Sequence, residues 1–177
     1  MEVVEFPASL KVIEYMPMLN NFSCLRKIIF KGTTELRNSG ANFVGNPLTV
    51  KEIINVHMTF INASGPVSGM SNLEKVTFAD NLPNSTTLGS NLCNKSRLRE
   101  IKLPNTITTI NSYALTGTAI SEIDIPESIT FISNYAFKRC SNLRTMIIRA
   151  TTPPTAEETD RKHVSDLCTI YVPSASL

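Results

Sequence analysis

The sequence lacks the features that mark membrane-spanning and charge-driven binding proteins. No apolar run approaches the roughly 18 residues that a membrane-spanning helix requires. Residues 1–5 have neither the basic start nor the apolar stretch of a signal peptide. The formal net charge is only +2 over 177 residues, so no excess of positive charge favours nucleic acid or an anionic membrane. The composition is instead that of a folded globular protein with room for one sizeable core.

Cysteine and histidine are sparse and poorly placed for a metal site. The cysteines are Cys24, Cys93, Cys140 and Cys168. No two of them form a C-x-x-C pair, so we expect small buried thiols, and their disulfide state and redox compartment stay open. Neither His57 nor His163 stands at ligand spacing from another candidate ligand. No metal and no cofactor is therefore predicted.

The sequence signatures of common enzymes are also missing. There is no G-x-S-x-G, H-E-x-x-H, P-loop or G-x-G-x-x-G motif, and the seven glycines are scattered. His57 is interpreted as a surface residue that follows a strand. His163 lies in a charged insert, residues 151–166, where a helical turn would bring Asp160 near it. We expect no enzymatic activity, and this insert is where a catalytic site would have to lie.

The sequence does contain an internal repeat. Residues 98–115 and 120–137 share the template L-x-x-I-x-L-P-x-x-I-x-x-I-x-x-Y-A-F, and the second copy closes on C-S-N-L. Sliding this template along the chain places repeat starts near residues 1, 25, 51, 73, 98, 120 and 143, with a final strand at 167–173. The repeat length is about 22–26 residues, which indicates a stack of short coils.

The third repeat is the ambiguous one, because its start could be Val50 or Lys51. We prefer Lys51, since that choice turns Ile54, Val56 and Phe60 inward, whereas Val50 would turn Asn55 inward. The repeats before residue 98 are less regular, and we expect long excursions at residues 33–46 and 59–67.

The repeat template explains why such coils would stack. The apolar residues of I-x-L are two positions apart and point to one face of a strand, and the following proline ends the strand because it cannot donate a ladder hydrogen bond. No segment keeps a helical apolar stripe for ten residues or more. One coil cannot bury its apolar face alone, but stacked coils share a continuous core in which the strands pair in parallel.

The regular part of the chain resembles the BspA-like leucine-rich repeats of surface proteins from anaerobic gut and oral bacteria. The resemblance rests on Ile120-x-x-Ile123-x-Ile125-Pro126, Ile129-x-x-Ile132, Tyr135-Ala136-Phe137 and Cys140-Ser141-Asn142-Leu143. Residues 150–154 and 169–173 are similar to the last repeat of that family. The resemblance implies a leucine-rich repeat solenoid of the α/β horseshoe superclass that is rich in β-structure. Each coil would have one parallel strand, with short turns or second strands on the convex side and few helices.

The two ends of the chain carry no polar cap, although terminal repeats usually need one. We therefore expect a single domain over residues 1–177 that is a fragment of a longer chain. Its uncapped edge strands would allow end-to-end self-association.

On each strand, the second and fourth residues after the repeat start should point outward and line the concave surface. The first column reads Val3, Lys27, Ile53, Lys75, Glu100, Glu122, Thr145 and Thr169. The second column reads Glu5, Ile29, Asn55, Thr77, Lys102, Asp124, Ile147 and Tyr171. The candidate binding face taken from them is Lys27, Ile29, Lys75, Thr77, Glu100, Lys102, Glu122, Asp124, Thr145, Ile147 and Tyr171. A basic flanking column, Arg26, Lys51, Arg99 and Arg144, would suit an acidic partner but lacks the aromatics of a nucleic-acid surface.

This face has two interpretations. Opposite charges on neighbouring strands, as in Lys75/Glu100 and Lys102/Asp124, would stabilise the sheet by about 0.2–1 kcal/mol per pair. Exposed apolar side chains among the charges, such as Ile147 and Tyr171, would instead suit recognition of a protein.

We expect a non-catalytic binding module of a bacterial cell-surface or secreted protein. Its partner would be a protein, for example a host extracellular or surface protein, with a glycan as the second choice and no nucleic acid. The resemblance supplies the cell-surface location and the adhesive role. The main alternative is a structural spacer that presents other domains, and the third is an enzyme with its site in residues 151–166.

Overall fold

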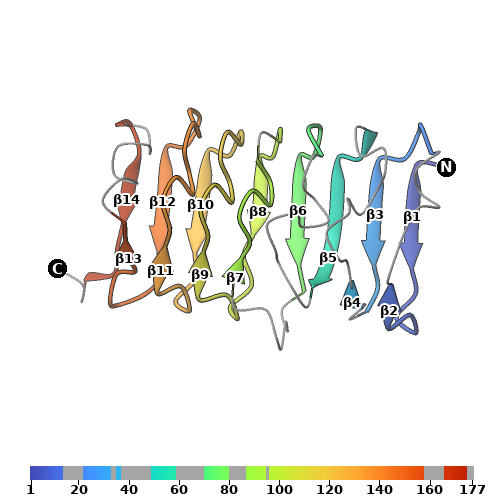
Figure 1. The fold of residues 1–177 in the computed structure, drawn as a ribbon, viewed down its shortest axis with the longest axis horizontal. Helices are drawn as coiled ribbons and strands as arrows, with labels where there is room; N and C mark the ends of the chain where they lie inside the picture. Colours follow the sequence, from blue (N-terminus) through green and yellow to red (C-terminus); the bar gives the residue numbers. More distant parts are fainter. Residues whose placement is uncertain are drawn as a thin grey trace.

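The computed structural model describes residues 1–13, 22–32, 35–36, 49–58, 70–79, 87–94, 96–157 and 166–174. These residues form strands and turns, and no α-helix occurs among them. The chain winds in stacked coils, and one strand of each coil joins a row that runs the length of the molecule (Figure 1). The row is β1 (Val3–Phe6), β3 (Lys27–Phe30), β5 (Glu52–Met58), β6 (Lys75–Phe78), β8 (Glu100–Lys102), β10 (Glu122–Ile125), β12 (Thr145–Ile148) and β14 (Thr169–Tyr171).

Shorter strands lie on the other side of the coils. They are β2 (Val12–Ile13), β4 (Glu35–Leu36), β7 (Thr87–Leu88), β9 (Thr109–Ile110), β11 (Phe131–Ile132) and β13 (Thr155–Ala156). All the recorded strand pairs are parallel, and all except β4 with β5 join strands on the same side of the coil. The predicted β-rich solenoid with second strands is therefore confirmed.

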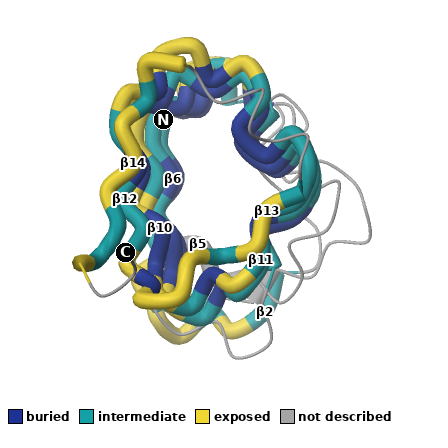
Figure 2. Tube along the Cα trace, turned by 90° about the vertical axis from the view of Figure 1, so that its left-hand side faces the viewer, coloured by how far each residue is buried: buried dark blue, intermediate teal, exposed yellow. Residues whose placement is uncertain are grey.

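The core fills the inside of the coils. Seen end-on, the coils superimpose as a ring in which buried residues alternate with intermediate and exposed ones (Figure 2). The first apolar position of successive repeats is fully buried at Leu25, Val50, Leu73, Leu98, Ile120 and Leu143. Each such side chain contributes about 1.5–3 kcal/mol through its removal from water. Because every coil repeats this position, the buried side chains form one continuous cluster.

The third repeat begins at Val50, so the preferred start at Lys51 was wrong. Val50 is fully buried, and Ile53 lies in register with the buried residues Ile28 and Val76. Lys51 is exposed, and its ammonium group lies 2.9 Å from a carboxylate oxygen of Glu74. Burial of an aliphatic side chain decides the register here, because an inward lysine would lose its hydration.

A β-bulge resolves the difficulty that Asn55 raised for this register. The pairing of β5 with β6 shifts between Ile53 and Val56, and Asn55 has a left-handed backbone with φ of 61°. Its backbone N–H donates to the Thr77 hydroxyl at 2.9 Å, and its side-chain amide donates to the Phe30 carbonyl at 2.9 Å. Asparagine tolerates this backbone region better than most residues, and the extra residue lets the strand continue beyond it.

The bulge also changes the position of His57, which was interpreted as following the strand. His57 lies within β5, in register with Glu35 of β4. The far end of β5 thus leaves the long row and pairs with the short strands on the other side of the coil.

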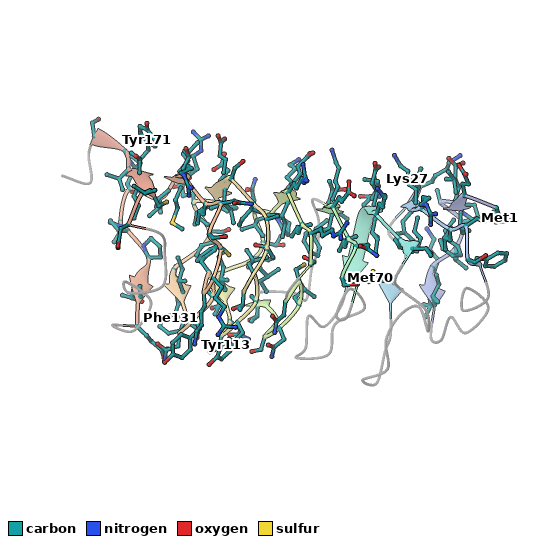
Figure 3. All side chains as sticks on the ribbon, turned by 90° about the horizontal axis from the view of Figure 1, so that it is seen from above. Met1, Lys27, Met70, Tyr113, Phe131 and Tyr171 are labelled. Atoms are coloured by element: carbon teal, nitrogen blue, oxygen red, sulfur yellow. The ribbon has the colours of Figure 1, made fainter. Side chains whose placement is uncertain are left out.

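The side opposite the long row carries a recurring left-handed turn. Asn91, Tyr113 and Tyr135 occupy it in three successive coils, with φ of 58°, 61° and 62°. The two tyrosine rings stack at 5.0 Å, and the Lys138 ammonium lies 4.4 Å from the centre of the Tyr135 ring. Figure 3 shows Tyr113 and Phe131 along this side, opposite Lys27 and Tyr171. Ring stacking and a cation–π contact offset the unfavourable backbone of these tyrosines.

Candidate functional site

The outward side of the long row, which we call the strand face, carries every residue of the predicted binding face. In parallel register, the first column contains Val3, Lys27, Glu52, Lys75 and Glu100, and then Glu122, Thr145 and Thr169. The second column contains Glu5, Ile29 and Ile54, then Thr77 and Lys102, then Asp124, Ile147 and Tyr171. Glu52 and Ile54 replace the predicted Ile53 and Asn55, because the third repeat begins at Val50. That these residues bind a partner stays a prediction.

Charges on the strand face pair along the first column. The Lys27 ammonium lies 2.7 Å from a carboxylate oxygen of Glu52, and Lys75 pairs with Glu100 as its sequence position suggested. Both pairs are partly exposed, so each contributes little to stability, in the range of about 0–1 kcal/mol. The two ion pairs nevertheless hold the lysine and glutamate side chains in place, so positive and negative charges have defined positions on this part of the strand face.

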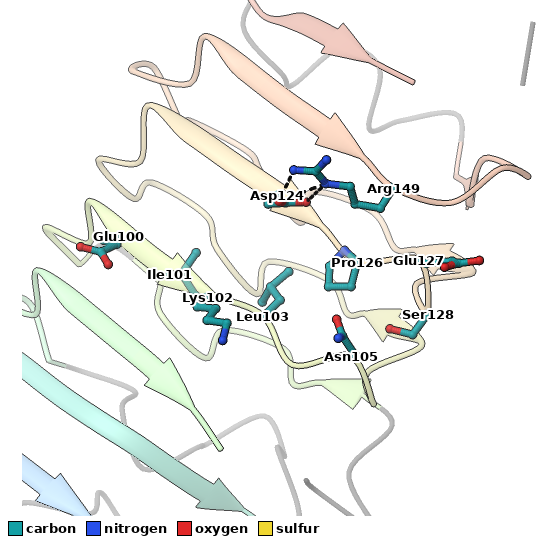
Figure 4. Close-up of a pocket in the computed structure, with 10 residues that line it drawn as sticks. All are labelled: Glu100, Ile101, Lys102, Leu103, Asn105, Asp124, Pro126, Glu127, Ser128 and Arg149. Atoms are coloured by element: carbon teal, nitrogen blue, oxygen red, sulfur yellow. Dashed lines mark hydrogen bonds and ion pairs between the residues drawn. The ribbon is translucent and has the colours of Figure 1, made fainter. Parts of the chain in front are cut away.

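Asp124 takes Arg149 as its ion-pair partner. The guanidinium donates three hydrogen bonds of 2.8–3.1 Å to the two carboxylate oxygens (Figure 4). The hydrogen bonds that Arg149 donates to Asp124, together with the negative charge of that carboxylate, raise the pKa of Arg149 above its ordinary value. Sequence reasoning missed Arg149 because it follows strand β12 and lies outside both columns. A bidentate contact of this kind orients both groups.

The basic flanking column is partly engaged in local contacts. Arg26 donates to the Thr49 carbonyl at 3.3 Å and Arg144 donates to the Ser141 carbonyl at 2.8 Å. Lys51 donates to Glu74, and this hydrogen bond lowers the pKa of the Glu74 carboxyl. These contacts hold three side chains of the column against neighbouring residues.

Apolar side chains on the strand face are most exposed at its C-terminal end. Tyr171 is 57% exposed, and its neighbour Ile170 is 53% exposed although it aligns with the buried Met146. Ile29, Ile54 and Ile147 are half-buried. The face therefore combines paired charges with separate apolar contacts, a mixture found at protein interfaces.

The strand row is interrupted between β8 and β10. The row forms one sheet up to β8 and a second sheet from β10, and Figure 1 shows a wider space here than between the other neighbours. In five coils, the N–H groups at the start of a strand donate to the preceding coil, as Arg144 and Thr145 do to the Ser121 carbonyl. Among the described residues, Ser121 and Glu122 make no such bond to the Arg99 carbonyl. On the opposite side, β7, β9 and β11 pair without a break.

The coil that leads to β10 is the shortest: Ile120 follows Leu98 by 22 residues, whereas the other repeat starts from Leu25 to Leu167 are 23–25 residues apart. Before β12, the chain makes a four-residue turn in which the Leu143 N–H donates to the Cys140 carbonyl at 3.0 Å. The same turn precedes Leu25 and Leu73. Before β10 only Thr118 and Ala119 separate Gly117 from Ile120, one residue fewer than in the next coil. The short turn alone does not prevent pairing, because the turn before β8 has the same length and Arg99 and Glu100 still donate to the Glu74 carbonyl.

The break opens a hollow of about 860 Å³, which we call the slot (Figure 4). It is lined by Glu100, Ile101, Lys102, Leu103 and Asn105 on one side, and by Asp124, Pro126, Glu127, Ser128 and Arg149 on the other. Ile101 is half-buried, whereas its equivalents Ile28 and Ile123 are buried. The Ser128 hydroxyl is buried and has no hydrogen-bond partner. The slot thus has an apolar floor, a charged rim and an unused polar group, which are features of binding pockets.

The predicted buried thiols are found at two of the four cysteines. Cys93 and Cys140 are buried, Cys168 is half-buried and Cys24 is exposed; all four are free. Burial raises the pKa of Cys93 to about 12. Burial also raises the pKa of Cys140, although the hydrogen bond with Thr118 acts in the opposite direction and lowers it. Because the thiolate is the reactive form, these two thiols should be inert.

We expect a stepwise reaction of the folded protein with a disulfide reagent such as dithionitrobenzoate. At pH 8, Cys24 should react first and Cys93 and Cys140 should react only after urea unfolds the chain, because they are buried and protonated. Replacement of Cys24 by serine should remove the fast phase of thionitrobenzoate release. A fast phase that survives in this variant, and disappears when Cys93 is replaced, would contradict the assignment.

The described residues contain no group of three or more His, Cys, Asp or Glu side chains that could hold a metal ion. The described part of the chain also has no helix long and apolar enough to cross a membrane. His163 and Asp160, on which the alternative catalytic site depends, lie outside the described residues.

Comparison with known proteins agrees with the repeat and the fold. The family model described as BspA type leucine rich repeat region matches residues 68–154 in six copies. A crystal structure of a leucine rich cell surface protein from Faecalibacterium prausnitzii A2-165 is similar, with a TM-score of 0.53 and 21% sequence identity over 87% of this chain. The chain spans 49% of that protein. No curated protein matches the chain. Residues 68–154 are therefore BspA-type leucine-rich repeats, and the similar crystal structure shows that the chain has a leucine-rich repeat fold.

Proposed function

We propose that this chain is a non-catalytic binding module of a bacterial cell-surface or secreted protein, and that it recognises a protein through the strand face. The observation that carries the proposal is the composition of this face. Fixed charge pairs, such as Lys75–Glu100, lie beside outward apolar side chains, such as Ile147 and Tyr171. Protein interfaces combine apolar contacts with oriented charges in this way.

The cell-surface location is supported by likeness alone. The similar Faecalibacterium protein is described as a leucine rich cell surface protein, and this chain shares its fold. Repeat solenoids offer extended surfaces for binding, whatever the partner. A host extracellular or surface protein is the proposed partner class.

A spacer role is the second candidate, and the ion pairs favour it. If Lys27–Glu52 and Lys75–Glu100 serve only to stabilise the sheet, the strand face needs no partner. An enzyme with its site in residues 151–166 gains no support from the described residues.

We expect reversal of charge on the strand face to abolish capture of the partner. The test variant is Lys75→Glu with Lys102→Glu. Its matched control is Lys11→Glu with Arg139→Glu, which makes the same change of charge at exposed positions outside the strand row. Immobilised parent and control should retain the same proteins from the extracellular fraction of the native environment, identified by mass spectrometry. The test variant should lose them at least tenfold.

The spacer alternative predicts a different result from the same experiment. Parent, control and test variant would then retain equal amounts of every protein. Unchanged circular dichroism of the test variant is needed to show that its coils are intact.

A further inference from the structure

We propose that the edge of the molecule at which the strands of the long row begin binds a sulfated polysaccharide. The residues that bind it form the strand-start cluster, which we define as Arg26, Lys51, Glu74, Arg97 and Arg99. The inference concerns a second ligand on a different surface, so it goes beyond the recognition of a protein by the strand face and does not depend on it.

Four residues of the strand-start cluster lie side by side in four successive coils. Each directly precedes a strand of the row, and these strands begin at the same edge of the molecule (Figure 1). The Lys51 N–H donates to the Arg26 carbonyl at 2.8 Å. The Glu74 N–H donates to the Lys51 carbonyl at 2.7 Å, and the Arg99 N–H donates to the Glu74 carbonyl at 2.9 Å. Because neighbouring strands are about 4.8 Å apart, the backbones of Arg26 and Arg99 are about 14 Å apart along the row.

The strand-start cluster combines four cations with one carboxylate, which gives it a net charge of +3. Lys51 is paired with Glu74 at 2.9 Å. Arg26, Arg97 and Arg99 are exposed and form no ion pair with any described residue. The hydrogen bond from Lys51 lowers the pKa of Glu74, and the charges of Arg99 and Arg97 act in the same direction. The two arginines therefore lie close to the Lys51–Glu74 pair, with positive charge in excess.

This excess distinguishes the edge from the strand face beside it. Lys27 and Lys75 on the strand face each have a carboxylate partner in the next coil. The strand-start cluster instead has one carboxylate for four cations. An anion that approaches this part of the molecule is therefore attracted to the edge more strongly than to the strand face.

The surroundings of the cluster are polar, which favours a hydrophilic ligand over a folded protein. Ser23 and Ser71 are exposed in the turns that lead into two of these strands. The apolar residues that begin the same repeats are fully buried: Leu25, Val50, Leu73 and Leu98. A protein interface needs an apolar centre, and the cluster offers none. A polysaccharide needs no such centre, since its ring hydroxyls form hydrogen bonds with polar side chains.

The spacing and chemistry of the cations favour sulfate groups over the carboxylates of an acidic peptide. In an extended peptide, side chains on one side are about 6.8 Å apart, whereas successive coils are about 4.8 Å apart. A sulfated polysaccharide carries anionic groups on consecutive rings and on both edges of a ring, so several lie within reach of each coil. The guanidinium group of arginine binds two oxygens of such a tetrahedral anion at once. The cluster has no aromatic residue on which a nucleic-acid base could stack.

The test uses a fluorescein-labelled heparin octasaccharide with the whole chain, and fluorescence anisotropy as the readout. We expect saturable binding that weakens at least tenfold when NaCl is raised from about 0.05 M to about 0.5 M, because salt screens exposed charges. The same octasaccharide without its sulfate groups should bind at least tenfold more weakly, and so should an octapeptide of glutamate. Equal binding of the desulfated octasaccharide would overturn the proposal. Equal binding of the peptide would also overturn it, in favour of an acidic protein segment.

Charge reversal within the cluster locates the binding. Arg97→Glu with Arg99→Glu should weaken octasaccharide binding at least tenfold, with an unchanged circular dichroism spectrum because both side chains are exposed. The matched control, Lys11→Glu with Arg139→Glu, makes the same change of charge at exposed positions outside the cluster and should bind like the parent. An equal loss in both double variants would show a response to overall charge alone and would refute the cluster.

A change in the opposite direction provides a second, independent variant. Glu74→Gln removes the one carboxylate of the cluster, retains the size of the side chain and releases Lys51 from its ion pair. This variant should bind the octasaccharide at least threefold more tightly than the parent. It decides the result if the arginine variant proves to be misfolded, and unchanged or weaker binding by Glu74→Gln would refute the proposal.

The experiment separates this inference from the proposed function. If the octasaccharide does not bind, but the strand-face variant still loses its captured proteins, the polysaccharide proposal fails and the proposed function stands. If the octasaccharide binds as expected and capture of proteins is equal in parent and strand-face variant, the polysaccharide proposal stands and the proposed function fails.

Discussion

Adding one residue to the turn before β10 is expected to join the two sheets of the strand row. An asparagine inserted between Ala119 and Ile120 lengthens the coil from Leu98 to 23 residues, the length of the coil from Ile120 to Leu143. The N–H groups of Ser121 and Glu122 should then donate to the Arg99 carbonyl, as their equivalents do in the other coils. Two new hydrogen bonds would add about 0.5–1.5 kcal/mol each. The slot would close at the same time.

Hydrogen exchange measured by mass spectrometry or NMR provides the readout. In the parent, we expect the amides of Ser121 and Glu122 to exchange quickly, because they are at the unpaired edge of β10. In the insertion variant their exchange should slow by about 100-fold, which corresponds to about 2.7 kcal/mol of local opening free energy.

A control insertion tests the role of turn length. Placing the same extra asparagine between Ser141 and Asn142 lengthens a turn that is already complete, so it should weaken the pairing of β10 with β12. Exchange at Thr145 would then become faster. If the insertion after Ala119 leaves the exchange of Ser121 unchanged, turn length does not cause the break in the sheet.

Replacing Asn55 by valine should cost about 2–4 kcal/mol of the free energy of unfolding. A left-handed backbone costs a residue other than glycine about 1–2 kcal/mol, and more when the side chain is branched at Cβ. The substitution also removes the amide that donates to the Phe30 carbonyl, and the loss of one hydrogen bond costs about 0.5–1.5 kcal/mol. Urea denaturation followed by circular dichroism measures the loss.

The glycine variant separates the two causes. Asn55→Gly retains the left-handed backbone but loses the amide, so it should cost about 1 kcal/mol, roughly the value of one hydrogen bond. Valine and glycine variants of equal stability would show that the bulge backbone is not under the steric constraint that its φ of 61° implies.

The sequence was sufficient to predict the solenoid, because the spacing of its apolar residues is a local property that repeats. The inward pairs of I-x-L and the following proline determine a strand and its end, and stacking follows from the need to bury one face. The same spacing identified the outward positions of the strand face, among them Lys27, Lys75 and Tyr171. It also indicated the ion pair between Lys75 and Glu100 on neighbouring strands.

The features that distinguish one coil from the next depended on contacts between coils. The sequence favoured Lys51 because it disregarded a bulge, whereas the Thr77 hydroxyl and the Phe30 carbonyl stabilise Asn55 in that position. Asp124 forms its ion pair with Arg149, which is 25 residues away in the sequence, and the strand pattern did not indicate this partner. The short coil from Leu98 to Ile120 was visible in the sequence, but the break in the sheet beside it was not. Only the stacked coils show that β8 and β10 do not pair, because a parallel ladder depends on how neighbouring coils are aligned along their strands.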